Sequence, residues 1–370
     1  MPDVALVHDY FVQDGGGERV AIELSRLLPA AEIYTSFFDA SIFGDRIDPA
    51  RVHSWPLQGR VSTRDFRRLV QLYPLYFSAL DLRDAHLVVS SSSAFAKAVR
   101  TSRRAIHVSY IHTPMRFAYD PAAYFSQSSF GIAARAAGQI LRAPLAMWDR
   151  RTARQPDILV ANSETVRQRI REHWGRDAEV IHPPVSVSEF EVSTRDDGFL
   201  LIAARLLAYR RIDVAVRAAT AARRQLVIVG DGPERERLES LAGPTVRLTG
   251  WLPRTELIDL FARCHAYVVP GEEDFGIAPV EAMAAGKPVV ALARGGVGES
   301  VVDGVTGVLF DDQSPAGLEQ ALERLDGLTL DPAAIRARAE HFDRARFFDE
   351  WRALFVRLGV DPNLYRMSVD

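Results

Sequence analysis

Short apolar runs alternate with amphipathic stretches along the first half of the chain. Most of these runs are followed by a stretch with helical periodicity, of which Glu18–Leu28 is the clearest. Strands that alternate with helices predict a parallel sheet covered by helices on both faces. The predicted strands are Val4–His8, Ala30–Thr35, His86–Ser90, Ile106–Ile111, Ile158–Ala161 and Val180–His182.

The same alternation starts again at Phe199 and predicts a second domain of the same kind. We therefore predict an α/β fold of two doubly wound Rossmann-like domains facing a cleft, with ligands at the carboxyl ends of the strands. The second set of strands is Phe199–Ala203, Leu226–Val229, Val246–Leu248, Ala266–Val269, Pro288–Ala291 and Gly307–Phe310. The helices between them are Arg211–Ala222, Glu234–Leu241, Arg254–Arg263, Pro279–Ala285 and Pro315–Leu325.

The segment His182–Phe190 separates the two sets of strands. It contains Pro183 and Pro184, which prevent a central strand from continuing. This places a first domain at residues 1–184 and a second at 185–344. The chain ends with a helical run at Ala345–Leu358, and we expect residues 345–370 to pack back on the first domain.

Charge and composition exclude several classes of protein. The 370 residues carry a net charge of −3, so no basic field indicates nucleic acid. There is no apolar run of about 18 residues and no basic segment before Val4, which argues against a membrane span and a signal peptide. The single cysteine, Cys264, lies in an apolar run and is expected in the core. These features predict a cytoplasmic protein.

The segment Pro270–Val290 carries the most chemical information. Glu273 lies in a loop after a predicted strand, and Glu281 lies about one turn inside the following helix. Backbone N–H groups at a helix start bind anions, and carboxylates are strong acceptors for sugar hydroxyls. The two acids would then hold a hydroxyl-rich ligand with a phosphate between them. The alternative is that they only stabilise the helix start. The N–H groups in question belong to Phe275, Gly276 and Ile277.

This segment resembles the E-x7-E motif of the family 4 retaining glycosyltransferases, which have the GT-B fold. The similarity continues through Glu281-Ala282-Met283-Ala284-Ala285-Gly286-Lys287-Pro288. The family uses an Arg and a Lys after the first strand of the second domain to hold the diphosphate. Arg205 matches the Arg, and Arg210 stands where the Lys is usual. Gly230 and Trp251 lie in further matching segments, which the resemblance places beside the nucleotide, and a tight turn before a helix is the alternative interpretation of Gly230.

The first domain contributes two further segments to the resemblance. Gly15, Gly16 and Gly17 follow the first strand, and in the family this loop faces the donor phosphates. His112 follows a strand directly, and the family carries a His there near the transferred sugar. The surrounding segment Tyr110–Phe117 resembles the mannosyltransferases that build O-antigen and capsule-type polysaccharides.

Four other features have structural interpretations. We interpret Ser90–Ser93 and Asn162-Ser163 as helix caps. Asp196-Asp197 and Asp311-Asp312 are expected to form surface turns rather than a metal site. The basic amphipathic stretches Arg60–Tyr76 and Arg135–Arg154 either lie on an anionic membrane surface or pack with a solvated basic face.

The resemblance implies a retaining, metal-independent glycosyltransferase with no bound cofactor. Its donor would be a nucleoside-diphosphate sugar, GDP-mannose first and a UDP-sugar second. The acceptor would be a glycan or lipid-linked molecule of cell-surface glycan synthesis. Two alternatives remain open: a nucleotide-sugar epimerase of the same architecture and a non-catalytic sugar-nucleotide-binding subunit. The residues expected to act in catalysis are His112, Arg205, Arg210 and Glu273.

Overall fold

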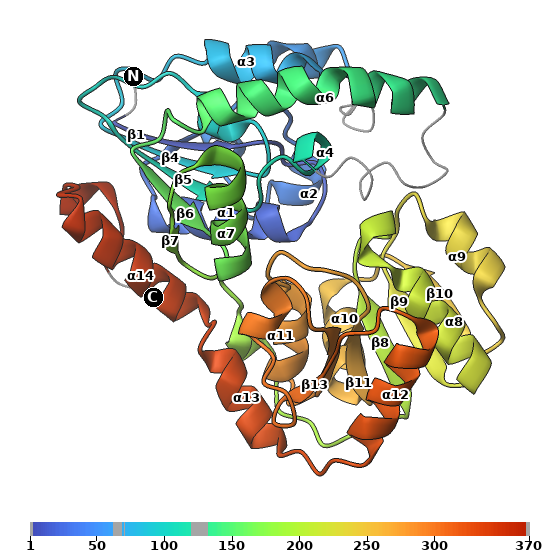
Figure 1. Cartoon of the computed structure of the whole chain (residues 1–370). Coiled ribbons are helices and arrows are strands. Elements are labelled where there is room, and N and C mark those ends of the chain that lie inside the picture. The colour runs from blue at the N-terminus through green and yellow to red at the C-terminus, as the bar shows by residue number, and fades with distance from the viewer. Residues whose placement is uncertain (1–2, 62–68, 70, 120–131, 368–370) are drawn as a thin grey trace. The chain divides into compact units, whose positions relative to one another are not determined.

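The computed structural model describes residues 3–61, 69, 71–119 and 132–367, with side chains described from residue 142 in the last range. The chain folds into two compact units (Figure 1). The first takes in Met1–Tyr119, Ala137–His182 and Phe347–Asp370, and the second includes Pro183–Arg346. The predicted C-terminal return is therefore present, since the end of the chain belongs to the first unit.

The first unit is built on a seven-stranded sheet in the order β3-β2-β1-β4-β5-β6-β7, and every neighbouring pair is parallel. Its strands are β1 Val4–His8, β2 Glu32–Thr35, β3 Val52–Ser54, β4 Leu87–Ser92, β5 Ile106–Ile111, β6 Ile158–Ala161 and β7 Glu179–Val180. Its helices are α1 Gly16–Leu27, α2 Ala40–Phe43, α3 Tyr73–Ala79, α4 Arg116–Tyr119, α6 Ile132–Thr152, α7 Glu164–Trp174 and α14 Arg344–Arg357.

Helices cover both faces of this sheet because its strands are apolar on both faces. In β1, Val4 and Leu6 belong to the core under α1 and α14, whereas Ala5 and Val7 belong to the core under α3. This two-residue alternation is the geometry of a strand. Helix α14 places Trp351, fully buried, in the first of these cores.

The second unit repeats this architecture with six parallel strands in the order β10-β9-β8-β11-β12-β13. Its strands are β8 Phe199–Ala203, β9 Gln225–Val229, β10 Val246–Gly250, β11 Ala266–Val269, β12 Val289–Leu292 and β13 Gly307–Phe310. Its helices are α8 Ile212–Ala222, α9 Arg235–Leu241, α10 Arg254–Arg263, α11 Ile277–Ala284, α12 Pro315–Asp326 and α13 Pro332–Glu340.

The two faces of the second sheet also have separate cores. Leu201 and Tyr267 pack with α10, α11 and α13, whereas Leu200 and Val268 pack with α8 and α12. Both sheets thus have the doubly wound arrangement that the sequence predicts, and the carboxyl ends of parallel strands gather at one edge of each.

Candidate active site

Three loops at the carboxyl edge of the second sheet pack closely enough to require glycine. A Cβ on Gly230 would lie 2.0 Å from the carbonyl oxygen of Ala204, and its φ of +128° is itself unfavourable for other residues. A Cβ on Gly271 would lie 2.4 Å from the carbonyl oxygen of Arg210. The loops after β8, β9 and β11 therefore meet backbone to backbone, and the predicted residues on them lie at one edge.

Glu273 and Arg210 form an ion pair on two of these loops. Both side chains are largely covered, with exposed fractions of 16% and 24%. The Glu273 carbonyl oxygen accepts from Gly296 N at 2.8 Å, so the loop after β12 fixes the acid's backbone. The Arg210 Nε is buried and has no hydrogen-bond partner among the described residues. The guanidinium thus keeps a donor for a further acceptor.

Helix α11 begins beside this pair with Gly276 as its N-terminal cap. Gly276 adopts φ +93°, a left-handed conformation that favours glycine. The first backbone N–H groups of a helix have no intrahelical acceptor, and those of Ile277 and Ala278 lie in the first turn. The Phe275 side chain is 2% exposed and packs on Phe342, so only its backbone can contact a ligand.

Glu281 lies deeper, at 3% exposure, and it pairs with Arg254. The Arg254 Nη1 lies 2.7 Å from Glu281 Oε1, and its Nη2 lies 2.9 Å from a carboxylate oxygen of Glu189. The same guanidinium stands 5.1 Å above the ring of Phe190. The Arg254 guanidinium thus lies between two carboxylates and an aromatic ring. Sequence reasoning missed Arg254, because it lies on the preceding helix and no motif marks it.

Arg205 and Trp251 complete the predicted set in this unit. Arg205 is half-buried in the loop after β8, and the next residue, Leu206, donates its N–H to Asp231 O at 3.0 Å. Trp251 follows β10 and is exposed. The structure therefore gathers Arg210, Glu273 and the start of α11 closely, with the other predicted positions on neighbouring loops.

In the first unit, the three glycines form the start of α1. Gly15 is the cap, and Gly16 and Gly17 are already helical. None has a positive φ. A Cβ on Gly17 would lie 3.6 Å from Nε2 of His112, so this glycine lies directly against the imidazole.

His112 follows β5 and is 8% exposed. Its Nε2 lies 2.8 Å from Ser91 Oγ, and its carbonyl oxygen accepts from Asn162 Nδ2 at 2.9 Å. The interpretation of Ser90–Ser93 as helix caps is wrong for the first three serines, because they are buried residues of β4. Ser163 does cap α7, accepting from Val166 N at 3.1 Å.

Glu18 is a buried acid beside this loop that sequence reasoning did not single out. Burial raises its pKa from 4.5 to about 8. Backbone N–H groups of Glu18 itself and of Gly15 lower the pKa, and the charges of Asp14 and Asp9 raise it. Asp9 accepts from four backbone N–H groups, those of residues 93–96, at 2.6–3.0 Å. Glu18 is thus largely protonated at neutral pH.

The raised pKa of Glu18 predicts a pH dependence of stability. Between pH 4.5 and about 8 the folded state binds a proton that the unfolded state has released, so stability falls as pH rises. The free energy of unfolding should fall by up to about 1.4 kcal/mol per pH unit relative to Glu18→Gln. Urea unfolding of both proteins from pH 5 to pH 9 measures this difference. Parallel curves for the two proteins would contradict the assignment.

No metal centre is evident in the part of the chain that the structure describes, where no three His, Cys, Asp or Glu side chains are arranged to hold an ion. Asp196 instead pairs with His265 at 2.7 Å, and Asp197 pairs with Arg195 and Arg263, each at 2.9 Å.

Two family models match the chain. The model described as Glycosyltransferase Family 4 matches residues 14–189, and the model described as Glycosyl transferases group 1 matches residues 188–340. Together they take in most of both units. Each half of the chain thus matches a glycosyltransferase family model, and the two models together span residues 14–340. This match agrees with the fold and with the family resemblance of the Glu273 and Glu281 segment.

The chain spans about half the length of the curated relatives it matches. A D-inositol 3-phosphate glycosyltransferase of Mycolicibacterium smegmatis is 30% identical over 260 residues, 62% of this chain and 59% of the relative. A glycogen synthase of Mycobacterium tuberculosis is 32% identical over 204 residues, 50% of this chain and 49% of the relative. These names do not include a mannosyltransferase, and that subgroup stays a prediction.

Solved structures match the chain over nearly its whole length. Anabaena Alr3699/HepE, determined in complex with UDP, has a TM-score of 0.69 and 18% identity, covering 96% of this chain and 100% of its own. Sucrose-phosphate synthase from Thermosynechococcus elongatus has a TM-score of 0.70 and 19% identity, covering 97% and 99%. At these identities the similarity establishes the fold.

Proposed function

We propose that this glycosyltransferase binds a nucleoside-diphosphate sugar in its second unit and transfers the sugar with retention of configuration. The observation that carries the proposal is the pair of arginine-bound acids at α11, Glu273 with Arg210 and Glu281 with Arg254. They lie before and within a helix whose first N–H groups suit a phosphate. Acceptors for hydroxyls and N–H donors for phosphate thus occur within the nine residues from Glu273 to Glu281.

When the donor binds, the ion pair between Arg210 and Glu273 can be replaced by contacts of each side chain with the donor. An arriving diphosphate would take hydrogen bonds from Arg205 and Arg210, and the Nε of Arg210 already lacks an acceptor among the described residues. Glu273 would then accept from sugar hydroxyls, and Glu281 from the ribose. The arginines and the helix N–H groups would stabilise the charge that develops on the leaving diphosphate. We assign His112 of the first unit to the transferred sugar.

GDP-mannose is the donor we propose first, on the resemblance of the segment around His112. The related fold of Anabaena HepE has been determined with UDP and with UDP-glucose, which makes a UDP-sugar the second candidate. A thermal-shift panel of GDP-mannose, GDP, UDP-glucose, UDP-galactose and UDP separates them. The largest rise in melting temperature is expected with GDP-mannose. A clear preference for a UDP ligand would overturn the donor assignment, and no rise with any ligand would overturn the donor site itself.

Two alternative functions make different predictions in a donor-only assay. An epimerase would convert the nucleotide sugar to its epimer without acceptor. A non-catalytic subunit would bind donor and turn none over, and Glu273→Ala would then weaken binding with no rate to lose. We expect slow release of nucleoside diphosphate without acceptor and faster release with one.

The acceptor we propose is a glycan or a lipid-linked molecule, reached from the cytoplasmic side of a membrane. Exposed Leu75 on α3 and Met147 on α6 belong to neighbouring helices, because Trp148 Nε1 donates to Ser78 Oγ at 3.3 Å. Figure 1 shows the two helices side by side. Exposed Arg150 and Arg151 lie one turn from Met147 on the same helix. Apolar side chains flanked by arginines suit an anionic lipid surface.

This apolar and basic patch predicts binding to anionic vesicles. The double variant Leu75→Ser/Met147→Ser should weaken binding to phosphatidylglycerol vesicles, measured by co-sedimentation, by about 100-fold, since burying each of the two apolar side chains contributes on the order of 1.5 kcal/mol. Val192→Ser/Val302→Ser, which removes two exposed apolar side chains from the second unit, is the matched control. Equal binding by both double variants would contradict the membrane assignment. Much of Arg60–Tyr76, and the side chains in the first part of Arg135–Arg154, lie outside the described part of the structure. The described helices include none apolar and long enough to span a bilayer.

A further inference from the structure

Three polar side chains from neighbouring parallel strands form a buried row in the first unit. His8 ends β1 and Ser91 lies opposite it in β4. His112 follows β5, the next strand, and its backbone N–H donates to Ser92 O at 3.0 Å. The exposed fractions of the three are 2%, 0% and 8%. Because they are buried, each hydrogen in the row needs an acceptor within the protein.

The first proton of the row can be assigned from a carbonyl group. The Nδ1 of His8 lies 3.1 Å from the carbonyl oxygen of Ser91, which can only accept. Nδ1 must therefore carry the hydrogen. Burial lowers the pKa of His8 to about 4, so the ring is neutral at pH 7 and its Nε2 carries none.

The direction of the Ser91 hydroxyl hydrogen follows from the position of the hydrogen on His8. The hydroxyl oxygen of Ser91 lies 3.1 Å from His8 Nδ1, and it accepts a share of that N–H. The hydrogen of the Ser91 hydroxyl itself also needs an acceptor. Among the contacts of this hydroxyl within the described residues, Nε2 of His112, at 2.8 Å, can accept it. If His112 instead donated from Nε2, two rings would donate to one oxygen and the buried hydroxyl hydrogen would lack an acceptor. Leaving a buried donor unsatisfied is the costlier arrangement.

We propose that Ser91 is a positioning residue that holds neutral His112 as the Nδ1–H tautomer. Because Ser91 occupies Nε2, any hydrogen bond from this ring to a ligand must come from Nδ1, and it must be a donated one. Gly17 packs against the Nε2 side of the ring, where a Cβ would lie 3.6 Å away. This assignment rests on the proposed function. It makes His112 a hydrogen-bond donor to a sugar oxygen through Nδ1, and it excludes Nδ1 as a base.

The tautomer is measured directly by long-range ¹H–¹⁵N NMR of protein labelled on histidine nitrogens. The His112 resonances are assigned by their loss in His112→Asn. At pH 8 the wild type should show Nδ1 as the protonated nitrogen of His112, and Ser91→Ala should shift the population toward Nε2–H. Ser92→Ala is the matched control, because Ser92 is buried in the same strand and its hydroxyl has no partner among the described residues. It should leave the tautomer unchanged.

A second variant covers the case in which Ser91→Ala does not fold. His8→Phe keeps a buried ring but removes the Nδ1 donor, so the Ser91 hydroxyl becomes free to accept. The Nε2–H form of His112 should then increase. A protonated Nε2 in the wild type would overturn the proposal, and so would an unchanged Nδ1–H population in both Ser91→Ala and His8→Phe.

Turnover separates this inference from the proposed function. Ser91→Ala should lower kcat about tenfold with an unchanged KM for the donor, since one oriented hydrogen bond in the transition state is lost. Ser92→Ala should retain wild-type kcat. A wild type that turns over no nucleotide sugar would remove the proposed function while the NMR result still decides the tautomer. An active wild type with a kcat insensitive to Ser91→Ala would overturn the positioning role alone.

Discussion

Replacing Glu273 with glutamine is expected to lower kcat/KM for the nucleotide sugar by about 100-fold, because hydrogen bonds to a charged group contribute about 1.5–3 kcal/mol each. In the proposed mechanism Glu273 contacts the sugar, whereas the arginines hold the diphosphate. Binding of the nucleoside diphosphate alone should therefore stay within about threefold of wild type. Loss of the carboxylate also releases Arg210 from its ion pair, which favours phosphate binding.

Steady-state kinetics and calorimetric binding of the nucleoside diphosphate, run on the same preparations, separate these two effects. Glu272→Gln is the matched control, since it makes the same chemical change one residue away in the same loop. It should retain activity within a few-fold. An unchanged kcat/KM in Glu273→Gln would contradict the role of the acid. If Glu273→Gln weakened binding of the nucleotide sugar and of the nucleoside diphosphate equally, Glu273 would act on binding of the diphosphate and not of the sugar.

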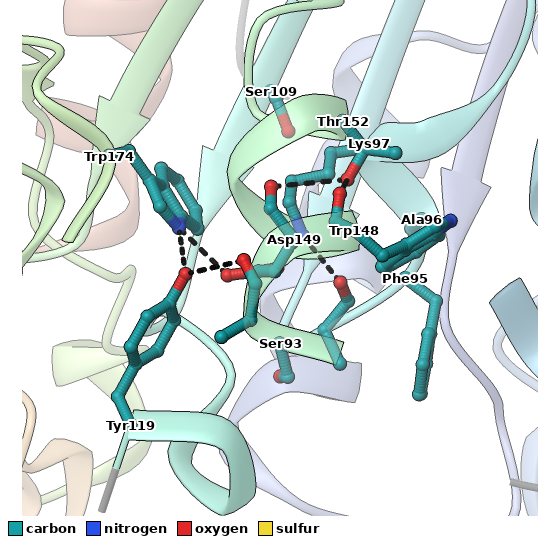
Figure 2. A network of polar contacts seen from close by, with 12 residues as sticks. Ser93, Phe95, Ala96, Lys97, Ser109, Tyr119, Trp148, Asp149, Thr152 and Trp174 are labelled. Atoms are coloured by element: carbon teal, nitrogen blue, oxygen red, sulfur yellow. Dashed lines mark hydrogen bonds and ion pairs between the residues drawn. The ribbon is translucent and has the colours of Figure 1, made fainter. Parts of the chain in front are cut away.

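Lys97→Met should destabilise the first unit by about 3–5 kcal/mol, since it leaves a buried carboxylate without its cation. Lys97 and Asp149 are 1% and 0% exposed, and their charged atoms lie 2.5 Å apart. Figure 2 shows Lys97 and Asp149 facing each other, with Trp174 beside the Asp149 carboxylate. Lys97 Nζ also donates to Ala94 O at 2.5 Å, and Asp149 of α6 accepts from Nε1 of Trp174, on α7, at 2.7 Å.

Denaturant unfolding monitored by tryptophan fluorescence measures this loss, because Trp148 and Trp174 flank the Lys97 ammonium. The double variant Lys97→Met/Asp149→Leu removes both charges and should recover much of the stability. Arg357→Met breaks an ion pair with Glu179 in which both side chains are about half exposed. It should change the free energy of unfolding by less than about 1 kcal/mol. Similar effects of Lys97→Met and Arg357→Met would contradict the structural role of the buried pair.

The alternation of apolar runs predicts the doubly wound architecture because strands buried on both faces leave a clear pattern. The ranges of Val4–His8, Ile106–Ile111 and Phe199–Ala203 agree residue for residue. The edge strand β3, Val52–Ser54, was missed because it is three residues long and none of them is buried. Propensity alone could not identify it.

The serines of β4 are a case in which polar residues led to a wrong prediction of helix caps. Ser90–Ser92 resemble a capping sequence, yet their strand is central and parallel to two neighbours. Ser90 Oγ contacts His107 Nε2 at 2.9 Å and donates to Ser109 Oγ at 2.8 Å, both across the β4–β5 ladder. These partners satisfy the hydroxyl inside the sheet, and they lie too far along the chain for a local pattern to reveal them.

The residues of the candidate site were proposed from residue type and family resemblance, and their pairing was not foreseen. The resemblance assigns Arg210 to phosphate and Glu273 to sugar, and the structure joins them in one ion pair. Arg254 was missed although it neutralises Glu281, because helix α10 brings it there from 27 residues earlier. Glu18 was missed because its raised pKa arises from burial, which depends on the packing of α1.

The most direct test of a retaining nucleotide-sugar transferase is ¹H NMR of the sugar released from an α-configured donor, with and without a lipid extract as acceptor. We expect nucleoside diphosphate to form together with transferred or free sugar, the first-formed anomer to be α, and Glu273→Gln to slow the formation of both products. First-formed β-anomer, an epimerised donor, or no release of nucleoside diphosphate from any donor of the panel would contradict a retaining transfer.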